Sequence, residues 1–168
     1  YYPVAEYRKL GDVDLYINNE NALKKAKEVL EKEGFVEEAE VSDHHLTYRY
    51  TFAQTGRTYL LELHYHIVGV YQYEPANQVV NEVFSEKNLC GEKQQIEGIE
   101  YQVLPPTEYV FYMLHHMLKH YLYSGFGIRL LCDFTFYVIR RQKEIDFEKL
   151  HSWCEKSHIM HFYETIIE

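Results

Sequence analysis

The sequence predicts an α+β fold: a small mixed β-sheet with helices on one side, followed by a C-terminal helical lobe. Apolar residues recur at helical spacing over residues 20–33, and two alternating aromatic and β-branched runs flank a turn near Gly56. From Pro105 onward the pattern is helical to the end of the 168 residues. We therefore divide the chain into a first lobe over 1–70, a connector over 71–104 and a helical lobe over 105–168.

The composition limits the classes of function. The chain has 17 Lys and Arg against 26 Asp and Glu, a formal charge of −9. Non-specific nucleic-acid binding needs a cationic surface instead, so a nucleic-acid partner is disfavoured. No apolar run reaches the ~18 residues of a membrane span, so we expect no membrane contact. The three cysteines are odd in number and lack C-x-x-C spacing, which indicates a reducing, cytoplasmic setting.

The first lobe opens on a stretch, residues 11–17, in which carboxylates alternate with apolar residues. Side chains two apart in a strand point to the same side, so Asp12 and Asp14 project together. The other side of this buried strand belongs to the core and carries Val13, Leu15 and Ile17. Hard cations such as Mg²⁺ bind carboxylate oxygens and remove the repulsion between paired aspartates. A turn at Gly11 with Asp14 as a local cap explains the same residues without a metal.

A helix over residues 20–33 follows, with Asn19 as its N-cap and Gly34 as its end. After it, the runs 45–53 and 58–67 and the turn 54–57 predict a β-hairpin.

The second arm of that hairpin alternates cleanly. Its apolar side carries Leu61, Leu63, Tyr65 and Ile67, and its other side carries Glu62, His64 and His66. Burying a carboxylate and imidazoles on a central strand is costly without partners. An adjacent strand bearing Asp12 and Asp14 would give these ionisable side chains partners, and Glu62 would then be the third carboxylate of a metal site. A sheet with one solvated face is the alternative.

The rest of the chain is mostly helical. We expect a short helix over 75–86, a connector or specificity loop over 87–102 with a small hairpin at Glu97-Gly98, and four helices in the last lobe. These helices run to about residue 123, over 128–142, over 147–156, and from about 158. His115 is a packed histidine, and His116 and His120 share one face of the first helix. Arg129 and Asp133, four apart, form an intrahelical ion pair in the simplest interpretation.

Three motifs together resemble the uncharacterised nucleotidyltransferase family of the polymerase-β-like superfamily. The first is the strand Arg8-Lys9-Leu10-Gly11-Asp12-Val13-Asp14, and the second is Leu61-Glu62-Leu63-His64-Tyr65. The third combines His115-His116 and His120 with Arg129-Leu130-Leu131-Cys132-Asp133. The similarity runs from about residue 1 to residue 137, in the family's motif order.

The resemblance implies a nucleotidyltransferase-like mixed sheet, a helical lobe that closes a cleft, and metal-dependent transfer of a nucleoside monophosphate from an NTP. Asp12 and Asp14 match the paired metal ligands, and Glu62 matches the third carboxylate; the ion is Mg²⁺ or Mn²⁺. Nucleotide contacts fall to Arg8, Gly11, His64 and Arg129. The acceptor is a hydroxyl of a small molecule or a protein. The superfamily's Gly-Ser turn, which grips the triphosphate, does not occur in residues 1–10.

Two other functions compete with this prediction. A nucleotidyltransferase-like domain without catalysis, serving as a binding or regulatory module, is consistent with the missing Gly-Ser turn. A zinc hydrolase is the second alternative, because His64-x-His66 and His116-x-x-x-His120 offer imidazoles. That spacing matches no zinc signature and leaves the three carboxylates unexplained.

Overall fold

The computed structural model describes residues 2, 4, 8, 11–39, 42–123, 125 and 127–167. Two motif residues used above, Lys9 and Leu10, lie outside the described residues. The chain forms two compact units, one over residues 4–70 and the other over residues 71–168 together with 1–3.

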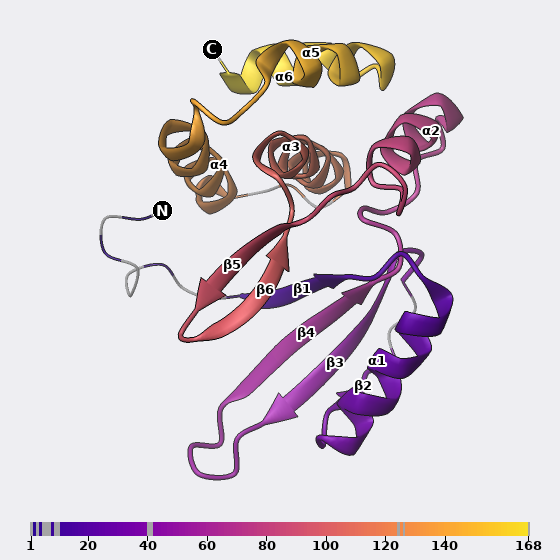
Figure 1. Cartoon of the computed structure of the whole chain (residues 1–168), viewed down its shortest axis with the longest axis vertical. Helices are drawn as coiled ribbons and strands as arrows, with labels where there is room; N and C mark the ends of the chain where they lie inside the picture. The colour runs from indigo at the N-terminus through magenta and orange to yellow at the C-terminus, as the bar shows by residue number, and fades with distance from the viewer. Residues whose placement is uncertain are drawn as a thin grey trace. The chain divides into compact units, whose positions relative to one another are not determined.

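The unit over residues 4–70 is a four-stranded mixed sheet with one helix. Its elements are β1 (Asp12–Tyr16), α1 (Glu20–Lys32), β2 (Val36–Glu37), β3 (His45–Thr51) and β4 (Thr58–His64). The strand order is β1-β4-β3-β2, with β1 parallel to β4 and the other neighbours antiparallel (Figure 1). The predicted mixed sheet of an α+β fold is therefore confirmed, and the strand with Glu62 is central.

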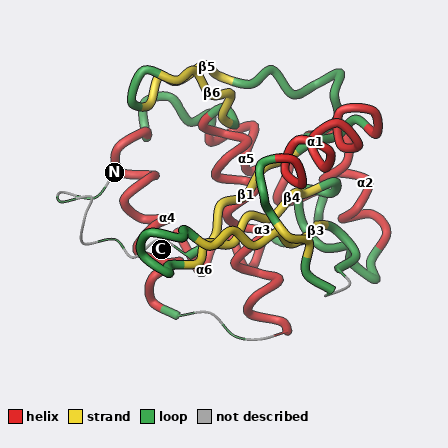
Figure 2. Tube along the Cα trace, turned by 90° about the horizontal axis from the view of Figure 1, so that it is seen from below, coloured by secondary structure: helices red, strands yellow, loops and turns green. Residues whose placement is uncertain are grey.

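Helix α1 lies on one side of this sheet (Figures 1 and 2). The Asn19 side chain accepts a hydrogen bond from the Ala22 backbone N–H at 3.0 Å and caps the helix as predicted. Gly34 follows the helix with a φ of 89°, a left-handed conformation that glycine adopts without strain. The next residue, Phe35, packs its ring against Tyr50 of β3 at 4.9 Å, which ties the end of the helix to the sheet.

The β3–β4 hairpin has a four-residue connection, because the Phe52 N–H donates to the Arg57 carbonyl at 2.9 Å. The predicted turn at 54–57 is therefore wrong by one residue. The observed connection places Thr51 opposite Thr58 and His45 opposite His64. This register decides which side chains meet across the two strands.

Two apolar side chains, Tyr48 and Leu63, are fully buried at the centre of the sheet. The expectation that Val13 and Leu15 are core residues is wrong: each is 41% exposed. The reason is the position of β1, which pairs with β4 alone and is an edge strand. One neighbour covers only one side of an edge strand.

The unit over residues 71–168 is helical apart from one hairpin. Its elements are α2 (Glu74–Val83), β5 (Glu92–Ile96), β6 (Ile99–Val103), α3 (Pro106–Tyr123), α4 (Ile128–Arg141), α5 (Phe147–Lys156) and α6 (Met160–Ile167). The β5–β6 turn has positive φ at Glu97 (51°) and Gly98 (81°), which suits a two-residue hairpin. The predicted hairpin at Glu97-Gly98 is thus confirmed.

Helix α3 is the centre of this unit and packs against α4, α5 and α6 (Figure 1). Its fully buried side chains include Phe111, Leu114 and His115, and α5 adds Leu150. The packed position predicted for His115 is confirmed. No helix among the described residues has the length and apolar character to cross a membrane.

Candidate functional site

The register of the sheet brings three of the predicted residues to one face. Asp14 lies beside Glu62 in the parallel β1–β4 pair, and Asp12 lies two residues before Asp14 on the same face. The antiparallel pair places His45 opposite His64 and Thr47 opposite Glu62 on this face. Asp12, Asp14 and Glu62 therefore share the polar face of the sheet.

Asp14, Glu62 and His64 form the closest part of this face. His64 Nε2 lies 3.2 Å from Glu62 Oε2 and 3.6 Å from Asp14 Oδ1. One donor atom from each residue can be chosen so that all three lie within 4.8 Å of one another, as metal ligands require. Asp12 is exposed and stands outside this group.

The charges of this group are balanced by the His64 ring. Burial lowers the pKa of His64, but hydrogen bonds and charges from Asp14 and Glu62 outweigh burial and raise it to about 9. The hydrogen bond from His64 lowers the pKa of Glu62 against the opposing effect of burial. An imidazolium thus sits between two carboxylates, where the oxygen donors also fit a hard divalent cation.

Two histidines that the sequence analysis did not select lie next to this group. The His45 ring is 5.0 Å from the His64 ring, and the His44 ring is 4.3 Å from His45 and 5.4 Å from His64, between centroids. His44, His45 and His64 also offer donor atoms that all lie within 4.8 Å of one another. The cross-strand register is the signal that could have found His45, since it faces His64 directly.

Residues just before β3 hold His44 in place. Its Nδ1 lies 2.6 Å from Asp43 Oδ1 and 2.9 Å from Ser42 Oγ, and Asp43 Oδ2 accepts the Val70 backbone N–H at 3.2 Å. Because an ionised carboxylate only accepts hydrogen bonds, the Nδ1 of His44 carries the proton. Burial lowers the pKa of His44, which favours the neutral ring.

The other predicted contact residues belong to different parts of the chain. Arg8 is half-buried and Gly11 is exposed, both ahead of β1 in the same unit. Arg129 is exposed in the first turn of α4, in the unit over residues 71–168. Their roles in nucleotide contact stay predictions.

Of the histidines suggested for a zinc hydrolase, only His64 belongs to a possible metal group in the described part of the chain, and it does so without His66, His116 or His120. His66 is exposed after the end of β4. On α3, the Nε2 atoms of His116 and His120 lie 2.8 Å apart, and the Tyr112 hydroxyl is 3.0 Å from His116 Nδ1. Hydrogen bonding within the helix therefore accounts for both histidines without a metal ion.

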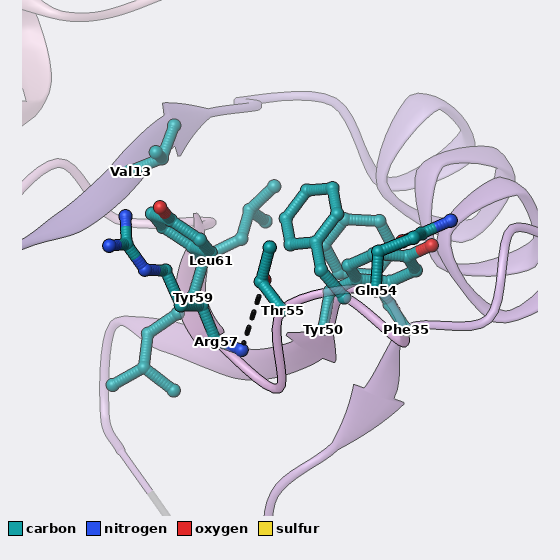
Figure 3. Close-up of a pocket in the computed structure, with 10 residues that line it drawn as sticks. Val13, Phe35, Tyr50, Gln54, Thr55, Arg57, Tyr59 and Leu61 are labelled. Carbon is teal, nitrogen blue, oxygen red and sulfur yellow. Dashed lines mark hydrogen bonds between the residues drawn. The ribbon is translucent and has the colours of Figure 1, made fainter.

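The opposite face of the sheet carries an open apolar cavity of about 420 Å³. Tyr50, Tyr59 and Leu61 line it from β3 and β4, and Phe35 and Val13 complete the apolar wall (Figure 3). Arg57, whose backbone N–H donates to the Thr55 hydroxyl at 3.3 Å, lies at its rim. This cavity is separate from the carboxylates, because alternate residues of a strand face opposite sides.

Carboxylates on neighbouring strands of a small mixed sheet are the arrangement expected of the nucleotidyltransferase class. The chain belongs to the family described as uncharacterised nucleotidyltransferase, whose model matches residues 1–168, the whole chain. Neither a curated protein nor a solved structure matches the chain significantly. The family resemblance seen in the sequence motifs is thus confirmed.

Proposed function

We propose that the protein is a metal-dependent nucleotidyltransferase that moves a nucleoside monophosphate from an NTP to a hydroxyl acceptor. In this proposal Asp12, Asp14 and Glu62 hold the Mg²⁺ or Mn²⁺ ions. The observation that carries it is the β1–β4 register, in which Asp14 stands beside Glu62 and Asp12 shares their face. The membership of the whole chain in a nucleotidyltransferase family supports the reaction class.

The residues suit the chemistry in distinct ways. When bound, divalent ions stabilise the attacking and leaving oxygens of an in-line displacement at phosphorus. Glu62, whose pKa is lowered by the His64 hydrogen bond, stays ionised at neutral pH and can accept the proton of the acceptor hydroxyl. His64, hydrogen-bonded to Glu62 at 3.2 Å, orients that carboxylate.

The nucleotide and the acceptor are assigned by charge. Arg8 and Arg129 supply guanidinium groups for phosphate, and Gly11 and His64 complete the proposed contacts. Since the formal charge is −9, a small molecule or a protein suits the chain better as acceptor than a nucleic-acid end does.

A catalytically inactive binding or regulatory module is the second candidate. The observation in its favour is the absence of a Gly-Ser pair from residues 1–10, just before the paired aspartates. Such a module could hold nucleotide, or another partner, without transferring a phosphoryl group.

A thermal-shift panel of the four NTPs, with and without Mg²⁺, tests the proposal. We expect the melting temperature to rise only with Mg²⁺ and a preferred NTP, and the Asp14→Asn variant to lose the rise. Glu28→Gln, an exposed carboxylate on α1, is the matched control and should keep it. Equal responses of Asp14→Asn and wild type would contradict the assigned ligands. Mg²⁺-dependent NTP binding without pyrophosphate release, across candidate acceptors, would favour the inactive module.

A further inference from the structure

We infer that His44, His45 and His64 form a binding site for a transition-metal ion of the Zn²⁺ class, beside the carboxylates proposed to hold Mg²⁺. The site comes from three imidazoles gathered at one end of the β3–β4 pair, and it does not require nucleotidyl transfer. Donor atoms from these three residues all lie within 4.8 Å of one another.

The spacing of the three rings suits a tetrahedral ion. At Zn–N distances of ~2.0–2.1 Å, tetrahedral ligand nitrogens lie roughly 3.4 Å apart. Donor atoms that lie within 4.8 Å of one another are therefore at most about 1.4 Å farther apart than the nitrogens of such a shell. Cross-strand pairing of His45 with His64 already fixes two of the rings relative to each other.

Two of the rings have the orientation that metal-bound histidines show. A metal-ligating imidazole donates its other N–H to a carboxylate or a carbonyl, which fixes its tautomer. His44 Nδ1 faces Asp43 Oδ1 at 2.6 Å, so its Nε2 lone pair is left to bind a metal. His64 Nε2 faces Glu62 Oε2 at 3.2 Å, and its Nδ1, which is buried with no hydrogen-bond partner within the described chain, releases its proton to solvent when it binds the metal.

The residues that hydrogen-bond to His44 are themselves held in position. Asp43 Oδ2 accepts the backbone N–H of Val70, and the Ser42 hydroxyl contacts both His44 Nδ1 at 2.9 Å and His45 Nδ1 at 3.2 Å. Such a supporting shell holds ligands near their bound positions before the metal arrives.

The donor type selects the ion. Imidazole nitrogens suit Zn²⁺, Cu²⁺ and Ni²⁺, whereas Mg²⁺ prefers oxygen. An oxygen ligand, from water or from Glu62 at 3.7 Å from His45 Nδ1, completes a four-coordinate shell. The face of the sheet thus offers a nitrogen-rich site next to an oxygen-rich one.

The test begins with the full chain, stripped of metal with EDTA and titrated with Zn²⁺ against a chromophoric chelator. We expect one Zn²⁺ per chain, at least tenfold weaker binding in His44→Gln and in His45→Gln, and weaker binding by about 10–100-fold in Asp43→Asn. His66→Gln, an exposed histidine two residues beyond the site, is the control and should bind as wild type does. Equal Zn²⁺ affinity of wild type, His44→Gln and His45→Gln would overturn the inference.

A second measurement uses the wild-type chain alone, so it tests the zinc site even if a variant fails to fold. X-ray absorption of the wild-type chain with one Zn²⁺ should show three imidazole ligands. A shell made of oxygen alone, or the absence of stoichiometric binding, would refute the site. Asp12→Asn separates the two proposals, because it should lose the Mg²⁺–NTP response and keep Zn²⁺. Zinc binding without any nucleotide response would overturn only the proposed function.

Discussion

Acid should destabilise the unit over residues 71–168 through His115. This ring is fully buried on α3, with Nδ1 2.8 Å from the Tyr71 hydroxyl, and Nε2 has no partner within the described chain. Burial lowers the pKa of His115 from 6.5 to about 3. Below pH 6.5 the unfolded chain therefore binds a proton that the folded chain refuses, and the free energy of unfolding falls as the pH falls.

The magnitude follows from the two pKa values. At pH 5 the pH lies about 1.5 units below the pKa of the unfolded histidine, so proton binding stabilises the unfolded chain by about 2 kcal/mol relative to pH 8. The folded histidine, with its pKa of about 3, stays neutral over this range and gains almost nothing. A His115→Gln variant has no imidazole at this position and therefore lacks this acid destabilisation. Wild type and His115→Gln should both lose stability between pH 8 and pH 5, and the loss of unfolding free energy should be about 2 kcal/mol smaller in the variant.

Urea unfolding at pH 8, 6.5 and 5, followed by tryptophan fluorescence, measures this effect. Trp153 is the single tryptophan and lies 5.3 Å from Phe111, whose ring in turn lies 4.5 Å from His115. The exposed His161 provides the control, since His161→Gln should keep the pH dependence of wild type. Other titrating groups act alike in all three proteins and cancel. An unchanged pH dependence in His115→Gln would refute the reasoning.

Three further predictions concern the elements that support the two units. Asn19→Ala removes the cap of α1 and should lower the free energy of unfolding by about 1 kcal/mol in urea titrations, whereas Asn21→Ala, the second residue of the helix, should not. Leu114→Ala opens a cavity in the fully buried core of α3 and should cost about 2–5 kcal/mol by the same assay. Gly98→Ala meets open space but keeps a φ of 81°, so strain alone should cost about 1–2 kcal/mol; a loss near zero would show that the turn changes conformation.

The alternation of charged and apolar residues along two short strands was enough to predict that Asp12, Asp14 and Glu62 share one face of the sheet. Side-chain direction in a strand repeats every two residues, so it can be read without knowing the neighbours. The pairing of β1 with β4 was expected because a polar row on a central strand needs partners, and the structure contains this pair. Both inferences depend on local chemistry, which a sequence carries directly.

Other features depend on register and on position in the sheet, which the sequence specifies weakly. A turn displaced by one residue pairs His45 with His66 instead of His64, so the three-histidine group could not be predicted from the arms alone. His44 joins that group because it precedes the first residue of β3 and escapes strict alternation. The exposure of Val13 follows from the edge position of β1, which no local pattern of that strand reveals.

The parallel pairing of β1 with β4 also has a kinetic consequence. The β3–β4 hairpin closes over a short connection, but roughly fifty residues separate Asp14 from Glu62, and long-range pairing of this kind forms slowly. Adding β1 at the edge brings Asp14 against Glu62 and the His64 ring, whose positive charge lies between the two carboxylates. This late docking step should therefore weaken as the pH rises toward about 9, where the ring loses its charge, so that the rate at which the unit matures would depend on the acidity of the surrounding solution.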